Sequence, residues 1–461
     1  MKIADKNTSA VEMVKAALAK AEQYKDHNIF VSLNTEAALA KAEEIDRRIA
    51  AGEEVGRLAG VPYALKDNFL SKEGNTTASS KILEPFASPI TATSVAKLEA
   101  EGAIMIGRTN MDSFAHGSST ENSYFGATHN AADNERVAGG SSGGSAVAVA
   151  LDIVEFATGS DTGGSIRQPA SFNGVYGFKP TYGTISRYGV VAMASSTDCV
   201  GFFTQNAKDM ELLMEICAGQ DPMDMTTLPD YYATEAPREA KKIGVIKDFD
   251  NDSLNPDIRK ALEAKIAELK NDGYEIVELD MPTLKYALAV YYIVVPAEVA
   301  SNLSRHDGVR YGYRSDKAES LGDVYSKSRS DGFMPENKRR IMIGNFVLSS
   351  GFYDAYYLKA QKARTLIIEE YNKAFEKCDY ILTPVSPNPA FKLGEKTNDP
   401  VAMYLEDVMS VPINLAGVPS LAIPVGKTEA GLPLGLQIIG PRRSDKSLLE
   451  FAAKLAEKEE A

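Results

Sequence analysis

Two glycine- and serine-rich turns, close together in the chain, constrain the fold more than any other feature of this sequence. The first covers 139–145 (Gly-Gly-Ser-Ser-Gly-Gly-Ser) and the second covers 159–169 (Gly-Ser-Asp-Thr-Gly-Gly-Ser-Ile-Arg-Gln-Pro). Between them, residues 146–157 are apolar except at Asp152 and Glu155, which predicts a buried helix or strand instead of a flexible linker. Glycine permits positive φ angles and a close approach of the backbone to a ligand. The two turns therefore predict a site built from main-chain N–H groups.

The composition indicates a large globular protein. The chain has 461 residues, 44% of them hydrophobic, and Gly and Pro are spread along it without forming an obvious linker. A prior of about 150 residues per domain would allow three domains, but without a linker we expect one domain over 1–461. The formal net charge of −13 argues against direct binding of nucleic acid by this surface.

The cysteines and the lengths of the apolar runs predict in which cellular compartment the protein lies. Cys199, Cys217 and Cys378 are far apart and form no Cys-x-x-Cys pair, which is typical of free thiols in a reducing compartment. The longest apolar runs are shorter than the ~20 residues that a membrane-spanning helix requires. Residues 1–6 lack the apolar region of a secretory signal. We therefore expect a cytoplasmic protein that does not contact a membrane.

Strand and helix patterns alternate along the chain, which predicts an α/β fold with a central mixed β-sheet covered by helices on both faces. Ser9 and Glu12 form a capping-box pattern at the start of the first helix, and Gly52 should end the second. The segment 291–314 is aromatic and polar without clean periodicity, so no element is predicted there. Other helices are predicted over 36–51, 93–102, 209–218, 256–269, 338–371 (interrupted at 349–351) and 446–458, and strands over 28–33, 103–107, 243–246, 274–279, 380–383, 421–425 and 434–439.

Several common site chemistries fit the sequence poorly. The chain has four histidines without metal-ligand spacing, so no metal site is expected in it: His27, His116, His129 and His306. A Gly-x-Ser-x-Gly match surrounds Ser142, but polar residues precede it where an α/β-hydrolase elbow requires an apolar strand. Only His306 lies downstream to complete a triad with this serine. No Gly-Lys-Ser/Thr follows the first turn, which argues against a phosphate-binding loop.

A serine nucleophile that is activated by a group other than histidine remains. Ser165 follows the second glycine pair and precedes a predicted short helix. The backbone N–H groups of Thr162, Gly163, Gly164 and Ser165 are expected to converge on an anion at the start of that helix. Such a cluster of donors is an oxyanion hole, worth roughly 3–4 kcal/mol per donor in a dry site.

Lys66 is the candidate base for this serine. It follows the apolar run 60–65 directly and precedes a polar turn, a position where functional groups gather in α/β sheets. Taken alone, a surface charge is the commoner interpretation of such a lysine, because lysine is rarely fully buried. If burial lowers its pKa, the neutral amine is able to accept a proton from Ser165 through Ser141 as a bridge.

The two turns together with Lys66 resemble the amidase signature family. Its hallmark is Gly-Gly-Ser-Ser-Gly-Gly followed by Gly-Ser-Asp-x-Gly-Gly-Ser-Ile-Arg-x-Pro, and the match is without gaps. The resemblance implies that Lys66 is the general base, that Ser141 relays the proton and follows a cis peptide bond from Gly140, and that Ser165 attacks an amide carbonyl. It also implies one amidase domain over the whole chain, with packing helices over 9–51, a catalytic core over about 60–220 and a glutamine-pocket and partner-facing half over about 240–461.

Within the family, the chain is similar to the glutaminase subunits of tRNA-dependent glutamyl/aspartyl amidotransferases. This resemblance implies that Arg340 binds the α-carboxylate of glutamine, that Asp407 binds its ammonium group, and that Tyr291 lines the pocket. It implies no cofactor in this chain, ATP and Mg on a partner subunit, two partner subunits in all, and a misacylated tRNA (Glu-tRNA(Gln), Asp-tRNA(Asn), or both) bound through a partner. The segments that carry it are 109–112, 118–123, 301–312, 339–342, 348–357, 402–407 and 414–419.

Two alternatives stay open at this point. One is a stand-alone amidase that uses the same three residues on small amides. The other is a scaffold without catalytic activity, which the intact Lys66, Ser141 and Ser165 argue against.

The chain also departs from the family pattern. The family usually has an acidic residue where Ser113 stands and methionine where His116 stands, and it commonly has an aromatic residue and a proline within 131–138, where this chain has Ala138. None of these positions belongs to the proposed catalytic trio. The pocket wall near His116 is expected to differ from that of its relatives.

Overall fold

The strands assemble into one mixed β-sheet. They are β1 (Phe30–Leu33), β2 (Pro62–Lys66), β3 (Ile104–Thr109), β4 (Phe156–Asp161), β5 (Tyr176–Lys179), β6 (Cys199–Thr204), β7 (Lys242–Ile246), β8 (Glu275–Leu279), β9 (Tyr380–Pro384), β10 (Ser420–Lys427) and β11 (Pro433–Ile439). The computed structural model describes residues 1–236, 238–249 and 253–459. Across the sheet, the order is β1-β3-β2-β4-β6-β5-β10-β11-β9-β7-β8. β3, β2 and β4 are parallel, as are β9, β7 and β8. Antiparallel pairs connect these two groups.

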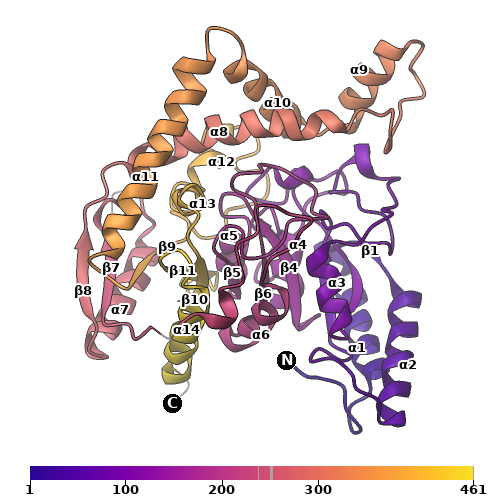
Figure 1. Ribbon diagram of the computed structural model, residues 1–461, viewed down its shortest axis with the longest axis horizontal. Helices are drawn as coiled ribbons and strands as arrows, with labels where there is room; N and C mark the ends of the chain where they lie inside the picture. The colour runs from indigo at the N-terminus through magenta and orange to yellow at the C-terminus, as the bar shows by residue number, and fades with distance from the viewer. Residues whose placement is uncertain (237, 250–252, 460–461) are drawn as a thin grey trace.

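Helices cover both faces of this sheet (Figure 1). They are α1 (Ala10–Gln23), α2 (Thr35–Ala51), α3 (Thr93–Ala100), α4 (Gly143–Ala150), α5 (Arg167–Asn173), α6 (Ala207–Cys217), α7 (Pro256–Asn271), α8 (Ala287–Asn302), α9 (Leu321–Gly332), α10 (Pro335–Leu348), α11 (Lys359–Phe375), α12 (Pro400–Leu405), α13 (Val411–Ala416) and α14 (Asp445–Glu459). Strand β2 illustrates the arrangement, because successive side chains point to opposite faces. Tyr63 and Leu65 join a core with α3, α6 and α14, whereas Ala64 joins a core with α1, α2 and α4. The predicted α/β fold with a central mixed sheet is confirmed.

Local sequence signals placed most of these elements correctly. Ser9 caps α1 by accepting a hydrogen bond from the Glu12 N–H at 3.4 Å, and Gly52 ends α2 at a φ of 72°. The apolar stretch 146–157, predicted as one helix or strand, contains the end of α4 and the start of β4. The predicted helix 338–371 is divided into α10 and α11, with a π-helical turn at Tyr353–Leu358 between them.

No element was predicted over 291–314, but helix α8 begins just before this segment and covers its first part. A continuous helical run, Leu284–Arg305, spans 22 residues and is by length and composition apolar enough to cross a membrane. In this fold, 56% of its most apolar window is buried inside the protein, where α8 packs against α10, α11 and α13. A helix that is buried on several sides has no polar stripe, so its periodicity is invisible in the sequence. The uninterrupted apolar run within this helix ends at Glu298 and is shorter than the ~20 residues of a membrane-spanning helix, as expected.

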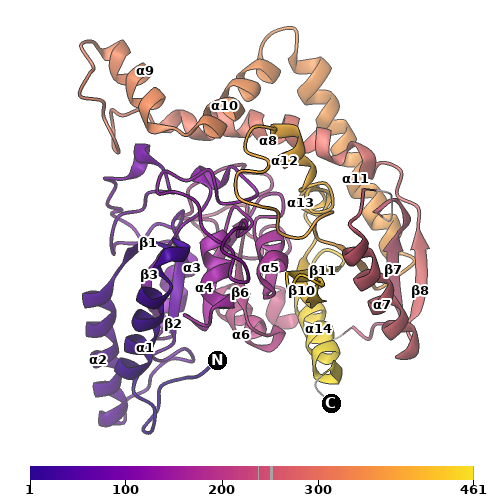
Figure 2. The same ribbon diagram turned by 180° about the vertical axis from the view of Figure 1, so that it is seen from behind.

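The fold brings distant segments to one edge of the sheet. Because β2 and β4 are parallel neighbours, their carboxyl ends lie at the same edge. The loops that follow them meet the loop before α4 at this edge, and α8, α10 and α12 extend over these loops in both views (Figures 1 and 2). This edge holds the candidate site.

Candidate active site

Lys66 ends β2 and is fully buried. Its Nζ lies 2.9 Å from Ser141 Oγ, 2.8 Å from Ser160 Oγ and 3.3 Å from the Ser160 carbonyl oxygen. Burial lowers the pKa of Lys66 to about 7, although the carboxylates of Asp112 and Asp161 favour the charged form. The interpretation of Lys66 as a surface charge is therefore wrong, and the conditional prediction that burial lowers its pKa is confirmed.

Ser160 determines how the neutral amine of Lys66 is oriented. A neutral amine has two N–H donors and one lone pair, and Ser160 offers two acceptors, its carbonyl oxygen and its hydroxyl oxygen. The side chain of Asn68 donates to the same hydroxyl at 3.0 Å, which holds it in place. With both N–H groups directed to Ser160, the lone pair of Lys66 faces the hydroxyl of Ser141. The arrangement allows Lys66 to accept a proton from Ser141.

The peptide bond between Gly140 and Ser141 is cis, as the family resemblance implied. On one side, the Gly140 N–H donates to Gln168 Oε1 at 2.9 Å. On the other, the Ser141 carbonyl accepts from the Asp112 N–H at 3.1 Å. A Cβ atom added to Gly140 would lie 2.1 Å from an oxygen of Asp112, so no larger residue fits there. These contacts fix the position of the Ser141 hydroxyl at Lys66.

Asp161 organises the loop that carries Ser165. Its buried carboxylate accepts from the Gly164 N–H at 2.8 Å and the Ile166 N–H at 3.1 Å. It also forms a buried ion pair with Arg167, whose Nη2 lies 3.0 Å away, and accepts from Asn414 Nδ2 at 2.9 Å. Burial alone would raise the pKa of Asp161, but the Arg167 guanidinium holds it below its ordinary range. Asp161 is therefore a permanent negative charge that fixes the backbone of this loop.

The predicted oxyanion hole has one donor fewer than expected. The Gly164 N–H donates to Asp161 and so is not directed at a substrate, which corrects the prediction for this residue. The N–H groups of Thr162, Gly163 and Ser165 remain as the candidate donors. Ser165 itself is 7% exposed, which leaves it within reach of a small ligand.

The two glycine-rich turns are joined by hydrogen bonds. The Ser142 N–H donates to the Ser165 carbonyl at 3.2 Å, so the turn with the relay serine and the turn with the nucleophile lie side by side. Tyr291, on α8, packs closely against Gly163. A Cβ atom added to Gly163 would lie only 2.5 Å from the tyrosine hydroxyl. The structure thus places the predicted pocket residue Tyr291 directly beside the candidate oxyanion hole.

Arg340 and Asp407, the predicted substrate-binding residues, meet at the ring of Tyr292. The Arg340 guanidinium lies 5.2 Å from the centre of this ring, and the Tyr292 hydroxyl donates to Asp407 at 2.8 Å. Ser118 donates to the other carboxylate oxygen of Asp407 at 2.8 Å. Burial raises the pKa of Asp407 to about 6, although these two hydroxyl donors favour its charged form. A buried cation and a buried anion therefore lie in one cluster, on different elements.

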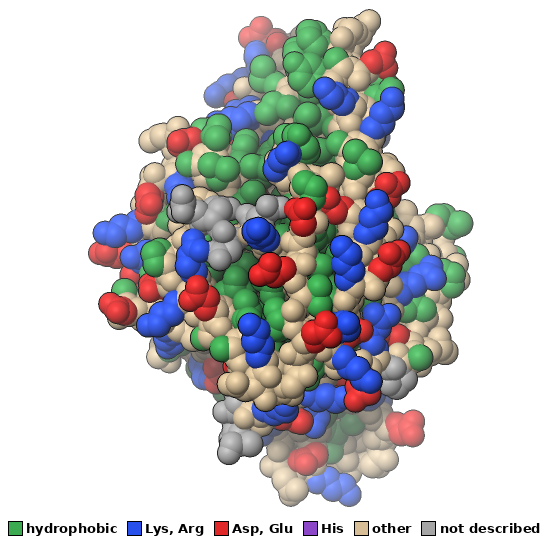
Figure 3. Space-filling view, turned by 90° about the vertical axis from the view of Figure 1, so that its left-hand side faces the viewer, with side chains coloured by type: hydrophobic (Ala, Val, Ile, Leu, Met, Phe, Trp, Pro, Cys, Tyr) green, Lys and Arg blue, Asp and Glu red, His purple; other side chains and the backbone are tan. Residues whose placement is uncertain are grey.

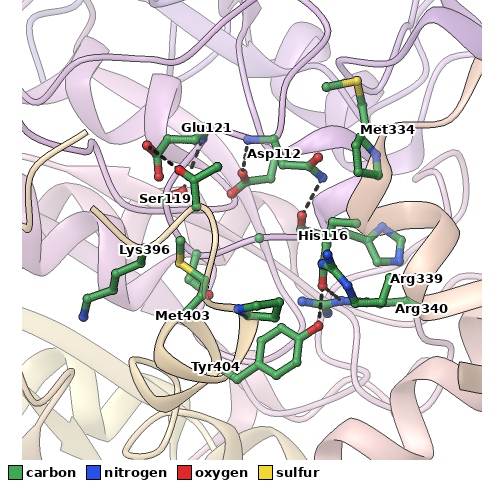
Figure 4. A pocket seen from close by; sticks show the side chains of 17 residues that line it. Asp112, His116, Ser119, Glu121, Met334, Arg339, Arg340, Lys396, Met403 and Tyr404 are labelled. Carbon is green, nitrogen blue, oxygen red and sulfur yellow. Dashed lines mark hydrogen bonds and ion pairs between the residues drawn. The ribbon is translucent and has the colours of Figure 1, made fainter. Parts of the chain in front are cut away.

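This cluster is connected to the nucleophile loop. The hydroxyl of Ser410 donates to the Gly163 carbonyl at 2.5 Å and lies 3.1 Å from the carbonyl of Asp407. A cavity of about 250 Å³ is lined by Arg340 and Ser118 of this cluster (Figure 4). It is large enough for an amino acid, and it is lined by Asp112, His116, Gly117, Ser118, Ser119, Glu121, Asn122, Met334, Pro335, Glu336, Arg339, Arg340, Lys396, Thr397, Pro400, Met403 and Tyr404.

Sequence reasoning missed five residues of the site. Asp161, Arg167 and Ser160 lie inside the second glycine-rich stretch. The available signal was the presence of an aspartate, an arginine and a serine in a stretch of glycines. Ser118 and Tyr292 gave no comparable signal, because each is recognisable only through its contact with Asp407, 289 and 115 residues away.

Fold and site together define an α/β enzyme with a lysine–serine site at one edge of a mixed sheet. The amidase family model matches residues 12–449, and the chain belongs to the amidase family.

Comparison with individual proteins indicates which members of the amidase family this chain is similar to. A glutamyl-tRNA(Gln) amidotransferase subunit of Geotalea daltonii is 49% identical over 457 residues, which cover 98% of this chain and 94% of that protein. The protein of the same name from a Cyanothece species is 50% identical over 444 residues, covering 95% and 92%. The crystal structure of the corresponding glutamyl-tRNA(Gln) amidotransferase subunit from Thermotoga maritima superposes with a TM-score of 0.79 at 37% identity, covering 97% of this chain and 91% of that one.

Proposed function

We propose that this chain is the glutaminase subunit of a tRNA-dependent amidotransferase. It would hydrolyse glutamine and supply ammonia for the conversion of Glu-tRNA(Gln), Asp-tRNA(Asn), or both. The observation that carries this proposal is the pairing of Arg340 and Asp407 at the ring of Tyr292, next to the loop of Ser165. A free amino acid has one carboxylate and one ammonium group. A guanidinium matches the first and a carboxylate the second.

The proposed mechanism follows from the contacts of Lys66. Its neutral amine accepts a proton from Ser141, which takes the proton of Ser165 as the Ser165 oxygen attacks the side-chain amide of glutamine. The N–H groups of Thr162, Gly163 and Ser165 stabilise the negative oxygen of the tetrahedral intermediate. The C–N bond then breaks, and the proton held by Lys66 returns through Ser141 to the departing ammonia. Water, deprotonated by the same route, hydrolyses the glutamyl ester and releases glutamate.

The acceptor reaction would take place on partner subunits. We infer that two other subunits complete the enzyme, that one of them binds ATP and Mg, and that the misacylated tRNA reaches the assembly through a partner. This division suits a chain with a net charge of −13, because RNA binding depends on basic residues. The proposal includes a cytoplasmic location and no cofactor in this chain.

An exposed apolar surface supports partner binding. On the arm formed by α10, the π-helical turn and α11, large apolar side chains are solvent-exposed, among them Met342 (72%), Leu366 (53%) and Phe346 (47%). Hydrophobic side chains gather at the upper end of the molecule in Figure 3. Exposed apolar patches of this kind mark protein–protein contacts.

The division of labour is tested by Ser165→Ala in the enzyme purified with its partners. The variant should lose glutamine-dependent amidation of tRNA but keep amidation with added ammonium salts. Loss of the ammonia-dependent reaction as well would refute the assignment of glutamine hydrolysis alone to this chain.

The role of Lys66 is tested separately with Lys66→Arg. Arginine stays charged, so the variant should be nearly inactive with glutamine, and wild-type activity would exclude a neutral base. Rapid hydrolysis of simple amides by the chain alone, with no partner subunits co-purifying, would favour the stand-alone amidase instead.

A further inference from the structure

The hydrogen bonds around His116 determine which ring nitrogen carries the proton. Asn337 Oδ1 accepts from the Ser113 hydroxyl at 2.8 Å and from the Met334 N–H at 3.1 Å, so Asn337 Nδ2 is the donor end of the amide. This Nδ2 lies 2.8 Å from the Ser113 carbonyl and 3.0 Å from His116 Nδ1. His116 Nδ1 also lies 3.3 Å from the Ser113 carbonyl, but a proton on Nδ1 would face the amide protons of Asn337. Nδ1 is therefore an acceptor, and the ring proton is on Nε2.

The Nε2–H of His116 lacks a hydrogen-bond partner among residues 1–236, 238–249 and 253–459. The side chain is fully buried, and an unsatisfied buried donor costs about 1–3 kcal/mol. Burial, together with the positive charge of Arg340, lowers the pKa of His116 well below its ordinary value. The ring consequently remains a neutral donor at physiological pH.

His116 and Arg340 line the same cavity (Figure 4). Arg340 uses its Nε to bind Glu336 at 2.9 Å, and this carboxylate also accepts from the hydroxyl of Tyr404 at 2.7 Å. Glu336 thus compensates much of the charge of Arg340. A ligand carboxylate has lone pairs for several donors, and it would satisfy the His116 N–H as well as the guanidinium.

We propose that His116 is a specificity-determining residue, which donates its Nε2–H to the carboxylate of the substrate beside Arg340. This donor favours amides that carry a free α-carboxylate over amides that lack one. This inference rests on the proposed function, because it takes glutamine as the substrate. It gives a role to one of the positions where the chain departs from the family pattern, and to the Ser113 and Asn337 side chains that hold the ring.

The test compares glutamine with 4-aminobutanamide, which keeps the amide and the amine of glutamine but lacks its carboxylate. Ammonia release is measured with the full chain and the subunits that co-purify with it. His116→Met should raise KM for glutamine by about tenfold to a hundredfold with little change in kcat, since one hydrogen bond to a charged group is lost. The kinetics with 4-aminobutanamide should change less than about twofold. His116→Gln offers an N–H donor from a side chain of similar length and should restore most of the affinity.

His306→Met is the matched control. His306 is also a buried histidine with an unpartnered ring nitrogen in the described residues, but it packs between Phe114 and Phe333 and does not line the cavity. Its substitution should leave KM for both substrates unchanged. If His306→Met raises KM for glutamine as much as His116→Met does, the inference is overturned.

The outcomes separate this inference from the proposed function. If the wild-type enzyme releases no ammonia from glutamine, the proposed function itself is wrong. If it does and His116→Met keeps the wild-type KM, or loses both substrates equally, only the role of His116 is wrong. Should His116→Met fail to fold, Ser165→Ala labelled with ¹⁵N-histidine provides a second measurement. Glutamine should shift the Nε2–H resonance of His116, and a resonance that stays in place overturns the inference.

Discussion

Replacing Lys66 by methionine should change the stability of the fold by an amount that depends on pH. The pKa of Lys66 is about 7 in the folded protein and about 10.4 in an unfolded chain. Below pH 7 the lysine is charged in both states, and the cost of burying its charge is fully present. Between pH 7 and 10.4 only the unfolded state is charged, so this cost falls as the pH rises. Above pH 10.4 both states are neutral and the cost is absent.

The magnitude follows from the difference between the two pKa values. At about 1.4 kcal/mol per pH unit, the cost of burying the charge of Lys66 is roughly 5 kcal/mol below pH 7. Methionine is neutral and has none of this cost, but its introduction removes the hydrogen bonds to Ser141 and Ser160, each worth about 1 kcal/mol at any pH. The diagnostic quantity is therefore the slope. The stability advantage of Lys66→Met should shrink by about 2 kcal/mol between pH 8 and 9.5.

Urea unfolding of the two proteins across this range measures the difference directly. The range avoids the titration of Asp112, whose pKa burial raises to about 7. Lys15→Met is the control, because Lys15 is exposed on α1 and is solvated in both states; its difference from wild type should not change with pH. Parallel stability curves for wild type and Lys66→Met would show that Lys66 is not neutral in the folded protein, and the proposed role as a base would fail with it.

Three further substitutions test the packing and the charges of the site. Ser160→Ala should lower kcat for ammonia release about tenfold with little change in KM, because the amine of Lys66 loses an acceptor. Ser160→Thr keeps a hydroxyl and should retain activity. An unchanged kcat in the alanine variant would remove Ser160 from the mechanism. Asp161→Asn leaves the buried Arg167 without its counter-charge and should destabilise the fold by about 3–5 kcal/mol in urea unfolding; a loss below about 1 kcal/mol would contradict the buried ion pair. Gly344→Ala would place a Cβ atom 1.9 Å from a carbonyl oxygen of α8, so thermal unfolding should reveal a loss of about 1–3 kcal/mol, and a wild-type melting temperature would contradict the close contact of α8 and α10.

The sequence by itself determined the parts of this protein that depend on short-range rules. Capping at Ser9, the left-handed glycine at Gly52 and the alternation of strands and helices predicted the element types, because caps, turns and periodicity act within a few residues. The glycine-rich turns and the match of Lys66, Ser141 and Ser165 to one family identified the candidate trio. The contact of Lys66 with Ser141 was predicted correctly on that basis alone.

Only the tertiary structure decided how the site is held and charged. The pKa of Lys66 depends on complete burial, and its orientation depends on Ser160, on a strand 94 residues away. The capture of the Gly164 N–H by Asp161, which removed one donor from the predicted oxyanion hole, followed from side-chain geometry that no local pattern encodes. Helix α8 was missed because packing on several sides erases the periodicity that sequence analysis detects. That same helix contributes Tyr291 and Tyr292 to the candidate site, so one part of this site was among the least visible in the sequence.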